Sequence, residues 1–150
     1  MVDSRAKGAR VETQIRDALR KLTNLTWERV PGSGALDPKH LLKGDLYVPG
    51  QNNLFCVEAK GYAEDHLTSK VLTGKSPQLL DFWAQAVRQG EQVKKKPLLV
   101  FKFDRSKIFV AFEDLPNGKY RTMLIDCDGY KFYVALLEDW ITKETIKFVT

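Results

Sequence analysis

The chain has 150 residues, of which 43% are hydrophobic and 29% are charged, and its formal net charge is +5. This length and composition fit one compact globular domain and exclude a disordered chain or a coiled coil, while the positive charge favours an anionic partner such as nucleic acid. The N-terminal segment lacks the apolar core of a secretory signal and no apolar run is long enough for a membrane span, so we expect a cytoplasmic protein without a membrane partner.

The first predicted element is an amphipathic helix over residues 4–22. Its apolar residues recur at three- and four-residue steps, which is the spacing of one helical face. Glu12 lies at the edge of that face, so we expect its side chain to point inward or sideways. A strand over residues 25–30 and a turn-forming stretch over residues 31–34 follow the helix.

The middle of the chain predicts two more strands, over residues 45–48 and 54–60. The turn of residues 49–53 joins them, which indicates an antiparallel meander together with the preceding strand. Both strands are rich in the apolar and aromatic residues that favour a pleated surface. We therefore expect residues from the three strands to meet across one sheet.

A second helix is predicted to begin at Ser76-Pro77, where serine is a good N-cap and proline suits the first helical position. It should run to Gln89 and end at Gly90, which is typical of the residue after a helix. The apolar strand over residues 98–103 comes after this helix. That order favours parallel pairing of the strand with the meander.

Three strand candidates and a short helical turn fill the C-terminal third, at residues 107–113, 121–126, 130–136 and 137–141. The whole pattern predicts the α/β class with a mixed sheet in a single domain of residues 1–150. Cys56 and Cys127 are far apart and form no CxxC pair, so we expect two buried, reduced thiols.

One group of polar residues stands out against these strands. Glu58 and Lys60 are two positions apart, so their side chains share a face of the sheet. Asp45 begins the neighbouring strand directly after Gly44, which permits an unusual backbone angle or a close approach. If the two strands pair through the turn between them, Asp45 lies near Glu58, and the Ala59 carbonyl adds a third oxygen.

Such a cluster of oxygens predicts a site for a hard divalent cation. Carboxylates without histidine or cysteine suit Mg²⁺ or Mn²⁺ rather than Zn²⁺. The chemistry that follows is phosphodiester hydrolysis, in which Lys60 positions the attacking water and Glu12 completes the site from the first helix. The alternative interpretation is structural, because alternating charges on the wet face of an antiparallel strand produce the same pattern.

The order of motifs resembles the archaeal-type Holliday junction resolvases of the PD-(D/E)xK nuclease superfamily. The resemblance covers about residues 5–103, and its motifs are individually weak but jointly specific. In this sequence they are Lys7-Gly8 followed by Glu12, the segment Arg29-Val30-Pro31-Gly32-Ser33-Gly34, Asp45, the segment Val57-Glu58-Ala59-Lys60, and Pro77-Gln78-Leu79.

The resemblance implies a restriction-endonuclease-like domain with its core over about 5–103 and further strands over about 107–150. It implies a homodimeric endonuclease that resolves four-way DNA junctions by paired cuts and uses Mg²⁺, with Mn²⁺ as a substitute and no small-molecule cofactor. The catalytic residues would be Glu12, Ser33, Asp45, Glu58, Lys60 and Gln78, the metal ligands Glu12, Asp45, Glu58 and Ala59, and the DNA contacts Lys7, Arg10, Arg29 and Ser33. Gln78 could equally be an exposed residue of a first helical turn.

Two departures from the resolvase pattern keep other functions open. The stretch from Ser33 to Asp45 is long, and Gly44 stands where a proline is usual. Both features also suit the virus-type replication-repair nucleases, which would make this a phage-encoded enzyme acting on branched or nicked DNA in the host cytoplasm. A third possibility is a non-catalytic DNA-binding module of the same fold, although three acids facing a polyanion argue against it.

Overall fold

The computed structural model describes residues 4–31, 43–62, 72–73 and 78–150, with the backbone alone for residues 4–7. Predicted features at Ser33 and at Ser76-Pro77 lie outside this part of the chain. The elements are α1 (Ser4–Thr23), β1 (Glu28–Arg29), β2 (Leu46–Tyr47), β3 (Phe55–Tyr62), α3 (Gln78–Val93), β4 (Lys96–Phe103), β5 (Ile108–Phe112), β6 (Met123–Cys127), β7 (Tyr130–Leu136) and α4 (Leu137–Glu144).

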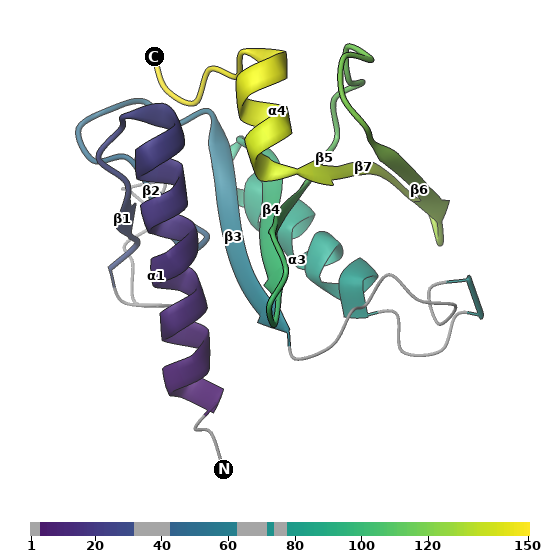
Figure 1. The fold of residues 1–150 in the computed structure, drawn as a ribbon, viewed down its shortest axis with the longest axis horizontal. Coiled ribbons are helices and arrows are strands. Elements are labelled where there is room, and N and C mark those ends of the chain that lie inside the picture. Colours follow the sequence, from purple (N-terminus) through teal and green to yellow (C-terminus); the bar gives the residue numbers. More distant parts are fainter. Residues whose placement is uncertain (1–3, 32–42, 63–71, 74–77) are drawn as a thin grey trace.

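The strands form one seven-stranded sheet in the order β1-β2-β3-β4-β5-β7-β6 (Figure 1). β3 and β4 pair in parallel, and every other pair is antiparallel. The predicted meander of β1, β2 and β3 is confirmed, and so is the parallel crossover through α3. The chain therefore has the predicted α/β architecture, a mixed sheet flanked by helices.

Helices cover both faces of this sheet. Alternate residues of β4 point to opposite sides, as the pleat requires, so Val100 packs toward α1 and α4 while Phe101 packs toward α3. Each side holds its own apolar core, with Ile15 and Trp140 in the first and Trp83 in the second. Burying one such large side chain stabilises the fold by about 1.5–3 kcal/mol, so the two cores fix the helices on the sheet.

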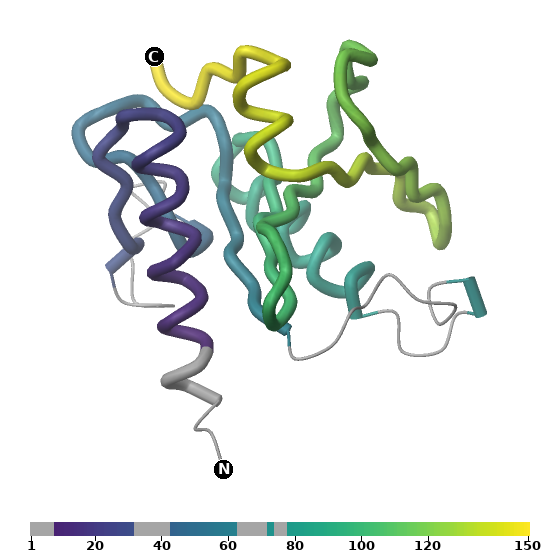
Figure 2. Tube along the Cα trace, viewed as in Figure 1, coloured from purple at the N-terminus to yellow at the C-terminus, as the bar shows by residue number. Residues whose placement is uncertain are grey.

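The C-terminal tail returns to the start of β3 (Figure 2). The Leu54 amide donates a hydrogen bond to the Phe148 carbonyl at 2.9 Å, and the Thr150 amide donates to the Asn52 carbonyl at 3.0 Å. Phe148 is buried and meets the ring of Trp27 edge to face, with centroids 5.2 Å apart. The tail thus pairs with the residues just before β3 and forms part of the first core.

Some predicted boundaries were wrong, and β1 is the clearest case. Its predicted range was 25–30, yet only Glu28 and Arg29 pair with β2. The Thr23 hydroxyl oxygen accepts hydrogen bonds from the Leu25 amide at 3.2 Å and from the Trp27 indole at 3.0 Å. These local bonds replace the ladder that the propensity of the segment predicted.

The end of α3 is a second correction. The helix passes through Gly90 and continues to Val93. Glycine at this position permits a close contact and does not mark the end of the helix. A Cβ at position 90 would lie 2.7 Å from the Lys95 carbonyl oxygen. α4 also ends later than predicted. It extends to Glu144, beyond the short turn predicted at residues 137–141.

The remaining differences are small. β2 is limited to Leu46–Tyr47, β3 continues to Tyr62, and the ends of β4, β5 and β6 shift by one or two residues from the predicted ranges. Both cysteines are free thiols, but Cys127 is half-buried at the edge strand, whereas Cys56 is buried as expected. Among the described residues, no helix combines the length and the apolar character needed to cross a membrane.

Candidate active site

β3 carries two of the predicted residues on one face. Glu58 is buried, with 2% of its surface exposed, and Lys60 is half-buried two positions later. Both point to the side of the sheet that α3 covers, where the Lys60 ammonium nitrogen lies 5.1 Å from the centre of the Phe82 ring. The predicted shared face is therefore confirmed, and the lysine is held over an aromatic surface.

Asp45 is fixed by three hydrogen bonds at the point where β2 begins. Its amide donates to the Val57 carbonyl at 2.7 Å, and its own carbonyl accepts from the Val30 amide at 2.9 Å. The carboxylate oxygen Oδ2 accepts a hydrogen bond from the Ala59 amide at 2.8 Å. The side chain is thus tied to the residue between Glu58 and Lys60.

Gly44 makes this approach possible, for both of the reasons that the sequence suggested. Its φ is +87°, which disfavours a side chain, and a Cβ there would lie 2.6 Å from the Val57 carbonyl oxygen. Its amide donates to the Gln89 side-chain oxygen at 3.0 Å. α3 therefore holds the backbone just ahead of Asp45.

The electrostatics of the acid pair are strongly perturbed. Burial, the charge of Asp45 and a hydrogen bond between the two carboxyl groups together raise the pKa of Glu58 to about 8, with burial as the largest cause. The Glu58 oxygen Oε1 is fully buried and has no hydrogen-bond partner. A buried oxygen without a donor is costly, so this atom is open to an additional ligand.

Glu12 reaches the same region from α1. Burial is the main cause that raises its pKa, and the charge of Asp45 acts in the same direction. The Arg29 side chain offsets this by donating from Nε to Glu12 Oε1 at 2.9 Å. Two residues with separate predicted roles, a metal-site acid and a DNA contact, are thus joined to each other.

The described residues contain no group of three acidic, histidine or cysteine side chains already close enough to enclose an ion. The structure brings together the pair Asp45 and Glu58. Glu12 lies near enough for the charge of Asp45 to add to burial in raising its pKa, and its own charge in turn adds to the raised pKa of Glu58. An oxygen-only donor set with one unsatisfied buried oxygen fits a hard divalent cation, whose charge would relieve the repulsion within the pair.

The other predicted residues lie in different places. Gln78 is exposed at the start of α3, and Ala59 is buried with its amide committed to Asp45. Arg10 is exposed on a flank of α1 away from Glu12. Ser33 lies outside the described residues, as does the side chain of Lys7.

Sequence reasoning missed two residues of α3 that support the site, Phe82 and Gln89. Together with Gln78 they stand at spacings of four and eleven residues, which place all three on one side of a helix. That spacing was the available signal. It could have shown which side of the helix faces β3, but not which contacts its residues make.

Comparison with known proteins finds a family, a related phage protein and a solved structure. A family model described as "Phage putative PDDEXK endonuclease" matches residues 3–148. Protein D14 of Escherichia phage T5 is 39% identical over 154 residues, which cover 97% of this chain and 96% of that protein. The solved structure of Hjc, a Holliday junction resolvase from the archaeal hyperthermophile Archaeoglobus fulgidus, superposes with a TM-score of 0.45 at 18% identity, covering 87% of this chain and 88% of the other.

Proposed function

The chain belongs to the phage PDDEXK endonucleases, and from this membership and the Asp45–Glu58 acid pair we propose that it is a Mg²⁺-dependent endonuclease that cuts four-way DNA junctions. Membership of this family confirms the predicted superfamily and the predicted nuclease class. The metal, the junction preference and the roles of individual residues are the parts that we propose.

The observation that carries the proposal is the buried, unpartnered Oε1 of Glu58 beside the carboxylate of Asp45. These two side chains and the Ala59 carbonyl would hold the ion. Glu12 would complete the site, either directly or through water, once its carboxylate leaves the Arg29 guanidinium. A bound Mg²⁺ supplies a Lewis acid for the scissile phosphate and lowers the pKa of a coordinated water.

The protein's own groups divide the remaining work. The Ala59 amide keeps one Asp45 oxygen in place, so the carboxylate does not need to be ordered when the substrate arrives. Lys60 places a positive charge beside the acids, where it orients the attacking water and offsets charge that develops on the phosphate. Phe82 limits the freedom of that ammonium group before the reaction.

The junction preference rests on the motif series and on the symmetry of the substrate. Two equivalent strands of a four-way junction must be cut together, and a two-fold homodimer presents two identical sites at a fixed separation. Contacts to phosphates position DNA without reading bases, so cleavage should depend on structure more than on sequence. The reaction would take place in the cytoplasm of a phage-infected cell.

A panel of labelled DNA substrates tests the proposal. The wild type in Mg²⁺ should cut a four-way junction in two symmetric strands, while Asp45→Asn and Glu58→Gln should not cut. Equal cutting of a linear duplex, or scattered cuts on the junction, would rule out a resolvase but leave a nuclease. No cutting of any branched or linear DNA in Mg²⁺ or Mn²⁺ would favour a non-catalytic DNA-binding module.

One feature favours a second candidate, a virus-type replication-repair nuclease. Asp45 follows a glycine that is required by its backbone angle and by its contact with Val57, and not the proline usual in the archaeal resolvases. The same substrate panel separates the two candidates. Preferred cutting of flaps or nicked duplexes over four-way junctions would support the second one.

A further inference from the structure

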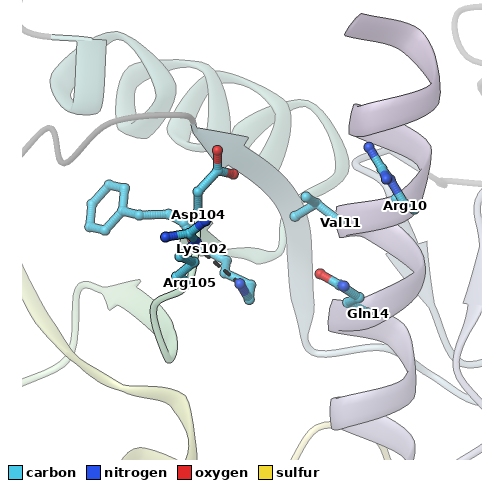
Figure 3. A pocket seen from close by; sticks show the side chains of 7 residues that line it. Arg10, Val11, Gln14, Lys102, Asp104 and Arg105 are labelled. Carbon is cyan, nitrogen blue, oxygen red and sulfur yellow. Dashed lines mark hydrogen bonds between the residues drawn. The ribbon is translucent and has the colours of Figure 1, made fainter. Parts of the chain in front are cut away.

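A pocket of about 340 Å³ opens between α1 and the end of β4 (Figure 3). Arg10 and Gln14 line it from α1, and Lys102 and Arg105 line it from the end of β4 and the turn after it. A helix turns about 100° per residue, so Arg10 and Gln14 share one side while Glu12, midway between them, points to the other. The pocket is therefore separate from the acid pair.

The pocket nevertheless lies at the level of Lys60. Val11 lines it and also packs on Gly61, where a Cβ would come within 2.7 Å of the valine side chain. Gly61 follows Lys60 in β3 and pairs directly with Lys102 in β4. The pocket lies on the α1 side of the sheet and the Lys60 side chain on the α3 side, so the sheet itself, at Gly61, separates the two.

Among the described residues, ion pairs do not neutralise the cations of the pocket, although the Lys102 ammonium donates a hydrogen bond to the Phe103 carbonyl at 3.1 Å. In the part of the chain that the structure describes, no carboxylate forms an ion pair with Arg10, Lys102 or Arg105. By contrast, Arg20 and Arg29 are each held by a glutamate. The lining contains one acid, Asp104, against three cations and an amide.

Arg105 adds a second, independent observation. Its φ is +62°, in the left-handed region that favours glycine and asparagine. Arginine gains nothing from the backbone at this turn, which is consistent with a role for its side chain. The planar guanidinium is suited to phosphate, which it can bind through two parallel hydrogen bonds.

We propose that this pocket binds phosphates of the DNA strand that flanks the cleavage point, with Arg10, Lys102 and Arg105 as the cations and Gln14 as a neutral donor. The proposal rests on the proposed nuclease function, and it extends the DNA contacts across α1. A neighbouring pocket that shares Lys102 is lined by Lys21 and Lys107 and also by the acids Glu138 and Asp139. From Arg10 to Lys21 the helix rises about 16 Å, which corresponds to roughly five base pairs of duplex.

The decisive variant is Arg105→Asn, because it removes the cation while giving the turn a residue that tolerates its backbone angle. Its stability should equal or exceed that of the wild type, so any loss of binding cannot be attributed to misfolding. Arg105→Lys keeps the charge and should retain the salt dependence of binding. Arg121→Gln with Lys131→Gln removes two exposed cations on or next to the β6–β7 hairpin and serves as the charge-matched control for Arg10→Gln with Arg105→Asn.

Binding would be measured by fluorescence anisotropy on a labelled four-way junction, with Ca²⁺ in place of Mg²⁺ and over a series of salt concentrations. Losing one phosphate contact should weaken binding about eightfold near 0.1 M salt and reduce the slope of log affinity against log salt by about 0.9. The double variant Arg10→Gln with Arg105→Asn should lose about twice that slope, and the control should match the wild type.

An unchanged affinity and slope in Arg105→Asn would overturn the proposal, and so would an equal loss in the control. A wild type that binds no DNA would overturn it as well. Cleavage in Mg²⁺ is scored separately. A wild type that binds the junction but does not cut it would contradict the proposed nuclease function, while the binding comparison would still decide the role of the pocket.

Discussion

Replacing the Glu58 carboxyl with an amide should change how the stability of the metal-free protein depends on pH. In the folded wild type this buried group has a pKa of about 8, whereas its ordinary value is 4.5. Between these values the folded state keeps a proton that the unfolded state has released, so stability is greatest at low pH and falls as pH rises. The slope is about 1.4 kcal/mol per pH unit.

From about pH 5.5 to about pH 7.5 this loss amounts to about 3 kcal/mol, or about 6–12 °C in melting temperature for a domain of this size. Glu58→Gln cannot release a proton, so its melting temperature should lack this component. The assay is thermal unfolding of both proteins in chelator, with the difference between them plotted against pH. Titrating groups that do not interact with Glu58 cancel in that difference, so parallel profiles would refute the assignment of a buried, protonated Glu58.

Three further predictions follow from contacts at the site. Gly44→Ala forces a Cβ against the Val57 carbonyl at a positive φ, so unfolding in denaturant should show that the free energy of unfolding falls by about 2–4 kcal/mol. A decrease of less than about 0.5 kcal/mol would contradict the tight contact. Phe82→Leu removes the aromatic face under Lys60 and should lower kcat about fivefold to tenfold, whereas Phe82→Tyr should keep a kcat near that of the wild type. An equal decrease of kcat in both variants would indicate a packing role instead. Mg²⁺ at about a hundred times its dissociation constant should stabilise the wild type by about 2.7 kcal/mol in a thermal melt, and a similar shift in Asp45→Asn would place the ion elsewhere.

The sequence predicted best the elements with a long and regular period. The stripe of apolar residues over residues 4–22 and the strand around Glu58 and Lys60 needed no knowledge of the rest of the chain. The pairing of Asp45 with that strand was also predictable, because a short turn joins the two segments and Gly44 precedes the acid. The outline of the fold and the position of the acid pair therefore follow from local pattern.

The contacts made by individual side chains were not predictable in this way. The Trp27 indole donates a hydrogen bond to Thr23, and the segment around it does not form the predicted strand. Gly90 permits a close contact with the backbone inside a helix and does not end that helix. The ion pair of Arg29 with Glu12 joins residues 17 positions apart on two elements. The contacts of Gly90 and of the Arg29–Glu12 pair depend on the distance between elements, which only the assembled fold determines.

The van der Waals contact between Gly61 and the Val11 side chain affects how the enzyme would respond to ionic strength. α1 rests on β3 through van der Waals contact at this point, and salt does not screen such contact as it screens charge. The position of the helix relative to Lys60 should therefore stay constant across salt concentrations at which DNA dissociates from the protein. In steady-state kinetics, added salt should raise KM steeply and leave kcat nearly level.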